Sequence, residues 1–105
     1  MTTRSKHAHA FAALGNDARL AIFQLLVKFG PDGLRVGEIS QHLDMAPSTL
    51  AHHLSTLVEA DLVTQEKFGR EVFNKADFAA VTRLAEFITS ECCQGVSPNR
   101  KEDAV

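Results

Sequence analysis

Apolar residues recur at intervals of three and four through most of the sequence, which is the spacing of one helical face. Five segments show this pattern: 7–14, 16–29, 37–43, 47–60 and 77–92. Turn or capping residues separate them, including Gly15 and Asn16 after the first segment and the Gly-Pro-Asp-Gly stretch 30–33 after the second. The pattern predicts five helices, of which the second is central because its apolar residues cover more than one stripe.

A different pattern follows the fourth segment. Residues 62–68 and 71–74 favour extended structure, and the Gly69-Arg70 pair between them indicates a β-hairpin. A tight turn joins the third and fourth helices, and Pro47 suits the first position of the fourth. A hairpin directly after such a pair predicts a winged helix-turn-helix, mainly α with one small hairpin. We expect one domain over 1–96 and a flexible tail over 97–105, which is almost without apolar residues.

Composition narrows the function classes. The 105 residues suit one domain, and no apolar run is long enough for a transmembrane helix, so we expect no membrane partner. The first residues lack the apolar stretch of a secretory signal, and two cysteines without a signal favour a reducing cytoplasm. The net charge is −2, so DNA binding would have to rest on local geometry rather than bulk charge.

The fourth segment is the candidate recognition helix. Its leucines define an inward face, and small hydroxyl residues and His52 lie on other faces near its start, where a recognition helix reaches base edges. An ordinary amphipathic helix with a solvated polar face has the same periodicity. His53 lies nearly on the leucine side, which favours a packed, hydrogen-bonded histidine. In the hairpin, Lys67 and Arg70 flank a glycine turn. In a wing, these two cations would meet the minor groove or phosphates. The alternative is a solvated turn whose charges serve only solubility.

The segments 14–22, 37–39, 47–57, 60–63 and 69–70 closely resemble the ArsR/SmtB family, and the likeness runs from residue 7 to residue 93. The His-His-Leu run of the recognition helix is its most diagnostic part. The resemblance implies a homodimeric repressor, paired through its first and last helices, that releases operator DNA when a metal, metalloid or oxidant reaches a sensor site. It implies DNA-facing roles for Pro47, Ser48, Thr49, Ala51 and His52, with Lys67 and Arg70 on the wing. Ala51 departs from the serine usual in the family.

The sensor site that the resemblance implies is Cys92-Cys93. Residues 35–38 lack the Cys-x-Cys of many members, and residues 76–96 lack the histidines of zinc and nickel sensors. Adjacent cysteines at the end of the last helix resemble an arsenic-responsive subgroup, and thiolates select soft trivalent arsenic. The implied inducer is arsenite or an organoarsenical, and DNA binding itself needs no cofactor. The subgroup usually has a third cysteine a few residues on, which 96–100 lack.

Several interpretations of this pair stay open. A methylated or aryl trivalent arsenical needs only two protein thiolates, because carbon holds the third position. A small thiol or a cysteine across the dimer could complete an inorganic site. The pair could instead be redox-active, through a disulfide or stepwise oxidation. Two small, soft hydrophobic side chains packed at a dimer interface are the non-functional alternative.

Other function classes have less support. His7 and His9 offer two ligands with no third in view, which makes a poor zinc site. An enzyme is not expected, because the sequence has no supported catalytic pair and no phosphate-binding glycine loop. A redox-responsive or ligand-independent repressor with the same DNA surface is the alternative within the leading class. A winged-helix module that binds another protein is the alternative from a different class, and it predicts no salt-dependent DNA affinity.

Overall fold

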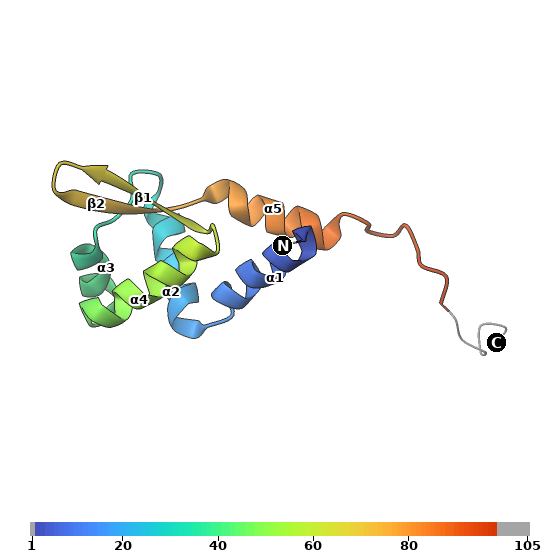
Figure 1. Cartoon of the computed structure of the whole chain (residues 1–105), viewed down its shortest axis with the longest axis horizontal. Helices are drawn as coiled ribbons and strands as arrows, with labels where there is room; N and C mark the ends of the chain where they lie inside the picture. Colours follow the sequence, from blue (N-terminus) through green and yellow to red (C-terminus); the bar gives the residue numbers. More distant parts are fainter. Residues whose placement is uncertain (1, 99–105) are drawn as a thin grey trace.

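The computed structural model describes residues 2–98, which form five helices and one antiparallel hairpin (Figure 1). In chain order the elements are α1 (Thr3–Leu14), α2 (Asp17–Phe29), α3 (Val36–Leu43), α4 (Pro47–Glu59), β1 (Val63–Phe68), β2 (Glu71–Ala76) and α5 (Phe78–Thr89). The hairpin directly follows the α3–α4 pair, so the predicted winged helix-turn-helix is confirmed. The expected tail falls mostly on residues 99–105, which lie outside the described residues.

Local capping explains where the helices begin. The side chains of Thr2, Asn16 and Asp77 accept hydrogen bonds from first-turn backbone N–H groups, at the starts of α1, α2 and α5. The apolar pattern predicts that the first helix begins at His7. In the structure α1 begins four residues earlier, at Thr3, because Thr2 caps it. The other end of the chain differs as well. Helix α5 ends at Thr89, so the expectation that it runs to Cys92 is wrong.

The core gathers around α2, which packs against α1, α3, α4 and β2. Its Ile22 and Leu26 are fully buried, and so are Leu50 and Leu57 on the inner face of α4. Apolar residues spaced over more than one stripe let α2 contact four neighbours at once, which confirms its predicted central place. Strand β2 reaches Ala76, two residues further than the sequence pattern indicates, because Ala76 pairs with Val63 inside the core.

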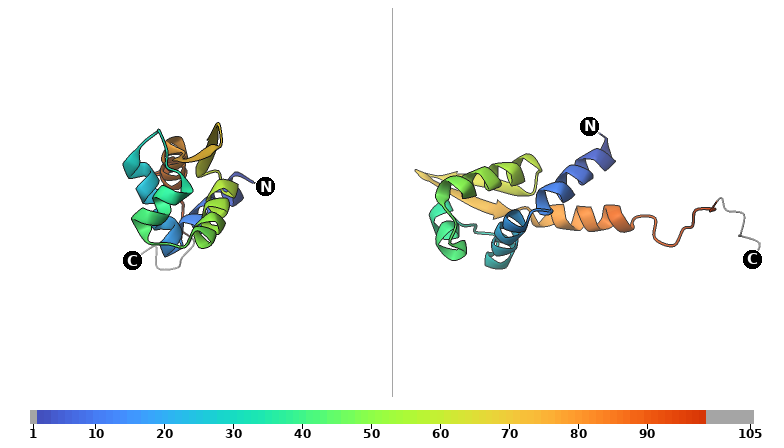
Figure 2. Two further views of the ribbon diagram at one scale, coloured as in Figure 1. Left: turned by 90° about the vertical axis from the view of Figure 1, so that its left-hand side faces the viewer. Right: turned by 90° about the horizontal axis from the view of Figure 1, so that it is seen from below.

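Helices α1 and α5 lie side by side and project from the helix-turn-helix body, whereas the hairpin lies at the opposite end of the described chain (Figures 1 and 2). No single helix within residues 2–98 is long and apolar enough to cross a membrane. Within these residues, only α1 and α2 taken together pass that test by length and composition, and the chain bends by 95° between the two helices.

Candidate DNA-binding surface and cysteine site

The turn between α3 and α4 sets how the recognition helix is presented. Asp44 ends α3 in the left-handed conformation, with φ at 50°, and Ser40 Oγ donates to the carbonyl of Met45 at 2.6 Å. Ala46 is extended because a proline follows it, and Pro47 then opens α4. The turn is therefore held by side-chain and backbone bonds before the recognition helix begins.

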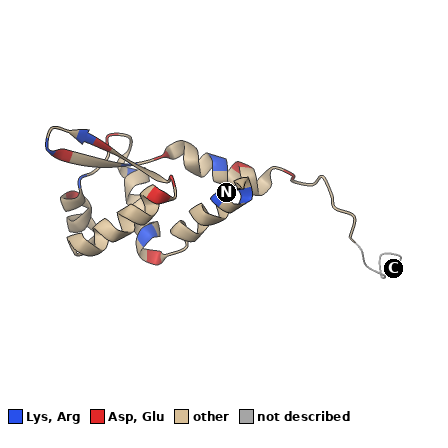
Figure 3. Ribbon diagram, viewed as in Figure 1, with Lys and Arg blue, Asp and Glu red and all other residues tan. Residues whose placement is uncertain are grey.

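Helix α4 buries its leucines and presents its polar face outward. The five candidate DNA-facing positions on it are all exposed: Pro47, Ser48, Thr49, Ala51 and His52. The helix carries no Lys, Arg, Asp or Glu before Glu59, and Figure 3 shows it almost wholly uncharged. Such a face can offer hydroxyl and imidazole groups to bases or phosphates, but it supplies no fixed positive charge.

His53 is half-buried beside the leucine face of α4, where the sequence pattern predicts a packed, hydrogen-bonded histidine. Its Nδ1 lies 3.4 Å from Nη1 of Arg19, whose Nε donates to the carbonyl of Ala13 at 2.7 Å. The His52 ring lies beside it, with ring centres 5.8 Å apart. Burial, then the charge of Arg19, then that of His52, hold the pKa of His53 below its ordinary value. A neutral ring accepting a hydrogen bond from Arg19 fits this setting, so His53 packs α4 against α2.

The hairpin tip supplies the positive charge that α4 lacks. Lys67 and Arg70 are exposed on either side of the turn, where Gly69 has a positive φ of 60°. Neither forms an ion pair with any residue in the described range 2–98. Phe68 at the tip is 63% exposed and meets Phe73 edge to face, with ring centres 6.2 Å apart. The tip thus presents two cations and an aromatic ring to solvent, the chemistry of a wing that meets phosphates.

A buried polar residue anchors the hairpin, and sequence reasoning missed it. Asn74 is fully buried, and its backbone pairs with that of Leu34 through bonds of 2.8 and 3.0 Å. Its side-chain amide donates to the Leu34 carbonyl at 3.1 Å and accepts from Gln65 at 2.8 Å. The available signal was the strand alternation, which places residue 74 on the same face as the buried Ala76. Asn74 ties β2 to the segment that leads into α3.

The two cysteines lie in the turn after α5. Cys92 N–H donates to the Thr89 carbonyl at 2.9 Å, and Cys93 has a positive φ of 62°. The left-handed conformation costs a residue with a Cβ about 1–2 kcal/mol. Both side chains are exposed, and their sulfurs are 3.3 Å apart, too far for a disulfide bond and close enough to share one ligand. The turn therefore brings two reduced thiols together at the surface.

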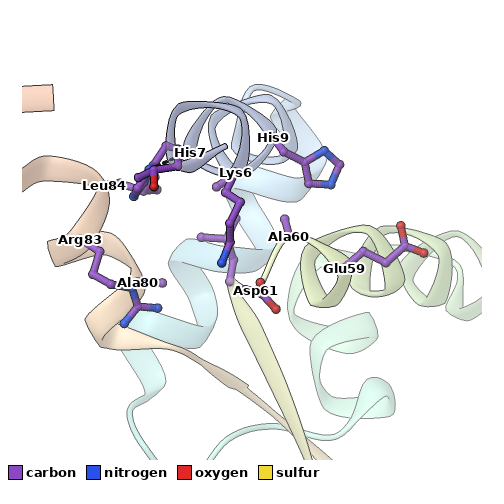
Figure 4. Close-up of a pocket in the computed structure, with 12 residues that line it drawn as sticks. Lys6, His7, His9, Glu59, Ala60, Asp61, Ala80, Arg83 and Leu84 are labelled. Carbon is purple, nitrogen blue, oxygen red and sulfur yellow. Dashed lines mark hydrogen bonds between the residues drawn. The ribbon is translucent and has the colours of Figure 1, made fainter. Parts of the chain in front are cut away.

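His7 and His9 do not converge on a common point. Nδ1 of His7 donates to the Thr3 carbonyl at 2.7 Å, and its ring stacks on Phe87 with centres 4.2 Å apart. Figure 4 shows His9 directed to the other side of α1, along a pocket of about 470 Å³ between α1, the end of α4 and α5. Within residues 2–98 no group of three His, Cys, Asp or Glu side chains is placed to hold a metal ion.

Comparison with known proteins identifies the family. A family model described as a helix-turn-helix domain matches residues 14–66. The HTH-type transcriptional regulator YbzH of Bacillus subtilis is 33% identical over 93 residues, which cover 77% of this chain and 93% of the relative. An ArsR-like transcriptional regulator from Rhodococcus superposes with a TM-score of 0.75 at 26% identity, over 84% of this chain and 80% of its own. The chain belongs to the ArsR/SmtB family.

Two further relatives have names that point to different regulatory roles. The transcriptional activator HlyU of Vibrio cholerae is 32% identical over 82 residues, 78% of this chain and 73% of the relative. A solved structure described as a possible regulator for arsenical resistance has a TM-score of 0.66 at 27% identity, over 77% of this chain and 81% of its own. Like the relatives it matches, this family member is a DNA-binding transcriptional regulator and not an enzyme.

Proposed function

We propose that this ArsR/SmtB family member is a homodimeric cytoplasmic repressor that a trivalent arsenical releases from operator DNA by binding Cys92 and Cys93. The observation that carries the proposal is the 3.3 Å separation of two exposed thiols in a turn directly after α5. The relative described as an arsenical-resistance regulator supports the choice of inducer.

The DNA surface in this proposal combines α4 and the hairpin tip. Exposed residues Pro47, Ser48, Thr49, Ala51 and His52 would face the major groove, and Lys67 and Arg70 would meet the sugar-phosphate backbone. The neutral face of α4 reads base edges, while the cations of the tip provide salt-dependent attraction. Because Ala51 has no hydroxyl, the contact that a serine would make there is absent.

The dimer in this proposal forms through α1 and α5. Helix α5 exposes Phe78, Val81 and Ile88 at helical spacing, and Ile88 is 66% exposed. Helix α1 exposes Phe11 to 39%. Exposed apolar residues that gather on neighbouring helices mark a protein-interaction surface. A second copy would bury them and place two recognition helices on one duplex.

The cysteine geometry favours arsenic over zinc. Consider one atom bonded to both sulfurs at about 2.3 Å, the length of a metal–thiolate bond. With the sulfurs 3.3 Å apart, the sulfur–centre–sulfur angle would be about 90°. Pyramidal trivalent arsenic fits that angle, whereas a tetrahedral zinc ion needs about 109° and four ligands. With a monomethyl arsenical, each thiol proton leaves with an arsenic-bound hydroxyl as water. Two As–S bonds form, and carbon keeps the third position.

Ligand binding there would act through α5. The turn follows the helix that we assign to the dimer, so a chelate at Cys92 and Cys93 would change how α5 ends and how it meets the partner. DNA and arsenical would then oppose each other through one coupling free energy, on the order of 1–3 kcal/mol.

Fluorescence anisotropy with the DNA upstream of the coding sequence tests the proposal. Reduced protein is bound at low salt and then titrated with arsenite, monomethylarsonous acid and zinc. We expect release by the methylated form at the lowest concentration, and loss of that release in Cys92→Ser with DNA affinity unchanged. Ser90→Ala in the same turn is the matched control and should respond as the native protein does. Release that persists in Cys92→Ser contradicts the sensor assignment.

A redox switch is the second candidate, favoured by the same sulfur separation and by the solved relative named as reduced HlyU, which is 29% identical with a TM-score of 0.63. Hydrogen peroxide would transfer one oxygen to a thiol, which becomes a sulfenic acid, and its other oxygen would leave as water. The second thiol would then displace a second water and form the disulfide. Release by peroxide and not by arsenicals would put this candidate first. No salt-dependent DNA binding at all would favour the protein-interaction module.

A further inference from the structure

One guanidinium joins the start of the helix-turn-helix to the hairpin. Arg35 is the N-cap of α3, where its backbone N–H and its Nε donate to Glu38 Oε1 at 2.9 and 3.1 Å. Its Nη1 donates to Glu71 Oε2. Glu38 lies in the first turn of α3, and Glu71 is the first residue of β2, directly after the wing tip. Side chains 36 positions apart in the sequence thus meet at one point.

A second tether lies next to the first. Leu34 pairs with Asn74, so the two residues before α3 hold β2 at both Glu71 and Asn74. These positions are about 10 Å apart along an extended strand. A single attachment would let the hairpin pivot about it, whereas two attachments at that spacing fix its direction. Residues 34 and 35 therefore help to fix the angle between the hairpin and α3, in addition to the packing of β2 against α2.

The positive charge of Arg35 is already more than balanced within the protein, because two carboxylates face it. Arg35 lies between two carboxylates, which raise its pKa, and its guanidinium holds the pKa of Glu38 below the ordinary value. Lys67 and Arg70, by contrast, have no such partners in the described chain. The Arg35 side chain is 47% exposed, and ion pairs as exposed as this contribute little to stability. Orientation, more than stability, is what such a network can provide.

We propose that Arg35 is a positioning residue for DNA binding, which holds the wing at the angle where its tip and α4 contact the same duplex. The proposal rests on the DNA surface proposed above. It assigns Arg35 no phosphate of its own, because two carboxylates of the same chain already pair with its guanidinium.

Glu71→Gln is the decisive variant, because it removes the carboxylate that joins the guanidinium to the hairpin and leaves Arg35 with its contact to Glu38. Operator affinity is measured by anisotropy across a salt series, and the amides of Gly69 and Arg70 are followed by ¹⁵N relaxation. We expect several-fold weaker binding, on the order of 1 kcal/mol, with an unchanged salt slope and a more mobile tip. Glu66→Gln removes the same charge from the same hairpin and should not weaken binding.

Arg35→Gln and the double variant Arg35→Gln with Glu71→Gln complete the cycle. Because both residues act through one contact, the double variant should bind no more weakly than Arg35→Gln alone. A direct phosphate contact by Arg35 predicts the reverse pattern: tighter binding in Glu71→Gln, and a salt slope reduced by about 0.9 per protomer in Arg35→Gln. That pattern, or native affinity in both single variants, overturns the positioning role. Failure of the native protein to bind DNA would instead refute the proposed DNA surface.

Discussion

The side chain of Arg19 on α2 meets the ring of His53 on α4, with Nη1 3.4 Å from Nδ1. Because Arg19 also donates to the carbonyl of Ala13 at the end of α1, one guanidinium links three helices beside the recognition surface. Burial and the neighbouring positive charges together lower the pKa of His53, so the folded protein favours the neutral ring.

This arrangement predicts that the protein loses stability as the pH falls. The unfolded chain protonates His53 near pH 6.5, and the folded chain does so only at lower pH. The unfolded state therefore binds more protons between those two values, and the free energy of unfolding decreases there as acid is added. Above pH 6.5 the contribution is fully present. Urea unfolding from pH 7.5 to pH 5 measures the decrease.

The His53→Gln variant isolates the effect. It should show a shallower pH dependence than the native protein over the same range. Arg19→Gln removes one of the causes of the lowered pKa and should also reduce the slope. Equal slopes in the native and His53→Gln proteins would show that this contact does not control the pH dependence.

Most of the fold follows from local patterns, and the exceptions are long-range. Helical periodicity, the 30–33 turn and Pro47 each act over a few residues, so they predict the elements and their order correctly. The contact of Arg35 with Glu71 depends on how the hairpin packs, which no local pattern encodes. Asn74 falls at the end of the predicted second strand, but its burial comes with its pairing to Leu34, which is 40 positions away in the sequence.

The candidate site divides in the same way. Exposure of the polar positions of α4 follows directly from the spacing of its leucines, so the sequence predicts which residues face outward. The position of the cysteines does not follow, because the last turn of a helix is weakly specified when no glycine or proline ends it. Their 3.3 Å separation depends on the left-handed conformation of Cys93, which the sequence does not reveal.

Substitution by alanine should have opposite effects on stability at Gly33 and at Gly37. A Cβ at Gly33 would lie 2.8 Å from the backbone oxygen of Asn74, at a positive φ of 79°. Gly33→Ala should therefore destabilise the protein by about 2 kcal/mol or more, because the conformation alone costs about 1–2 kcal/mol. A Cβ at Gly37, inside α3, meets nothing within 4 Å, and Gly37→Ala should stabilise it by up to about 1 kcal/mol. Urea unfolding curves of both variants measure the difference, and similar midpoints would contradict it.

Ile88→Glu should convert the proposed dimer into a monomer. Ile88 is 66% exposed in the protomer, so a charge there leaves the fold intact, whereas in an apolar interface it would be buried without a partner. Sedimentation velocity should show half the native mass, with an unchanged circular dichroism spectrum. Glu86→Gln, on another face of α5, is the control and should sediment as the native protein does. A native sedimentation coefficient for Ile88→Glu would place the interface elsewhere.

Arg70→Ala should weaken operator and non-specific DNA binding alike. Its guanidinium is exposed at the wing tip and has no ion pair within the described residues, so it is available to a phosphate, which carries no base information. Each lost phosphate contact lowers the slope of log affinity against log salt by about 0.9, and a dimer loses two, or about 1.8. Anisotropy titrations at several salt concentrations measure both quantities. Arg83→Ala removes the same charge from α5, where Asp77 pairs with it at 3.4 Å, and should keep the native slope. A native slope in Arg70→Ala as well would exclude the wing tip from the contact surface and leave α4 to bind DNA alone.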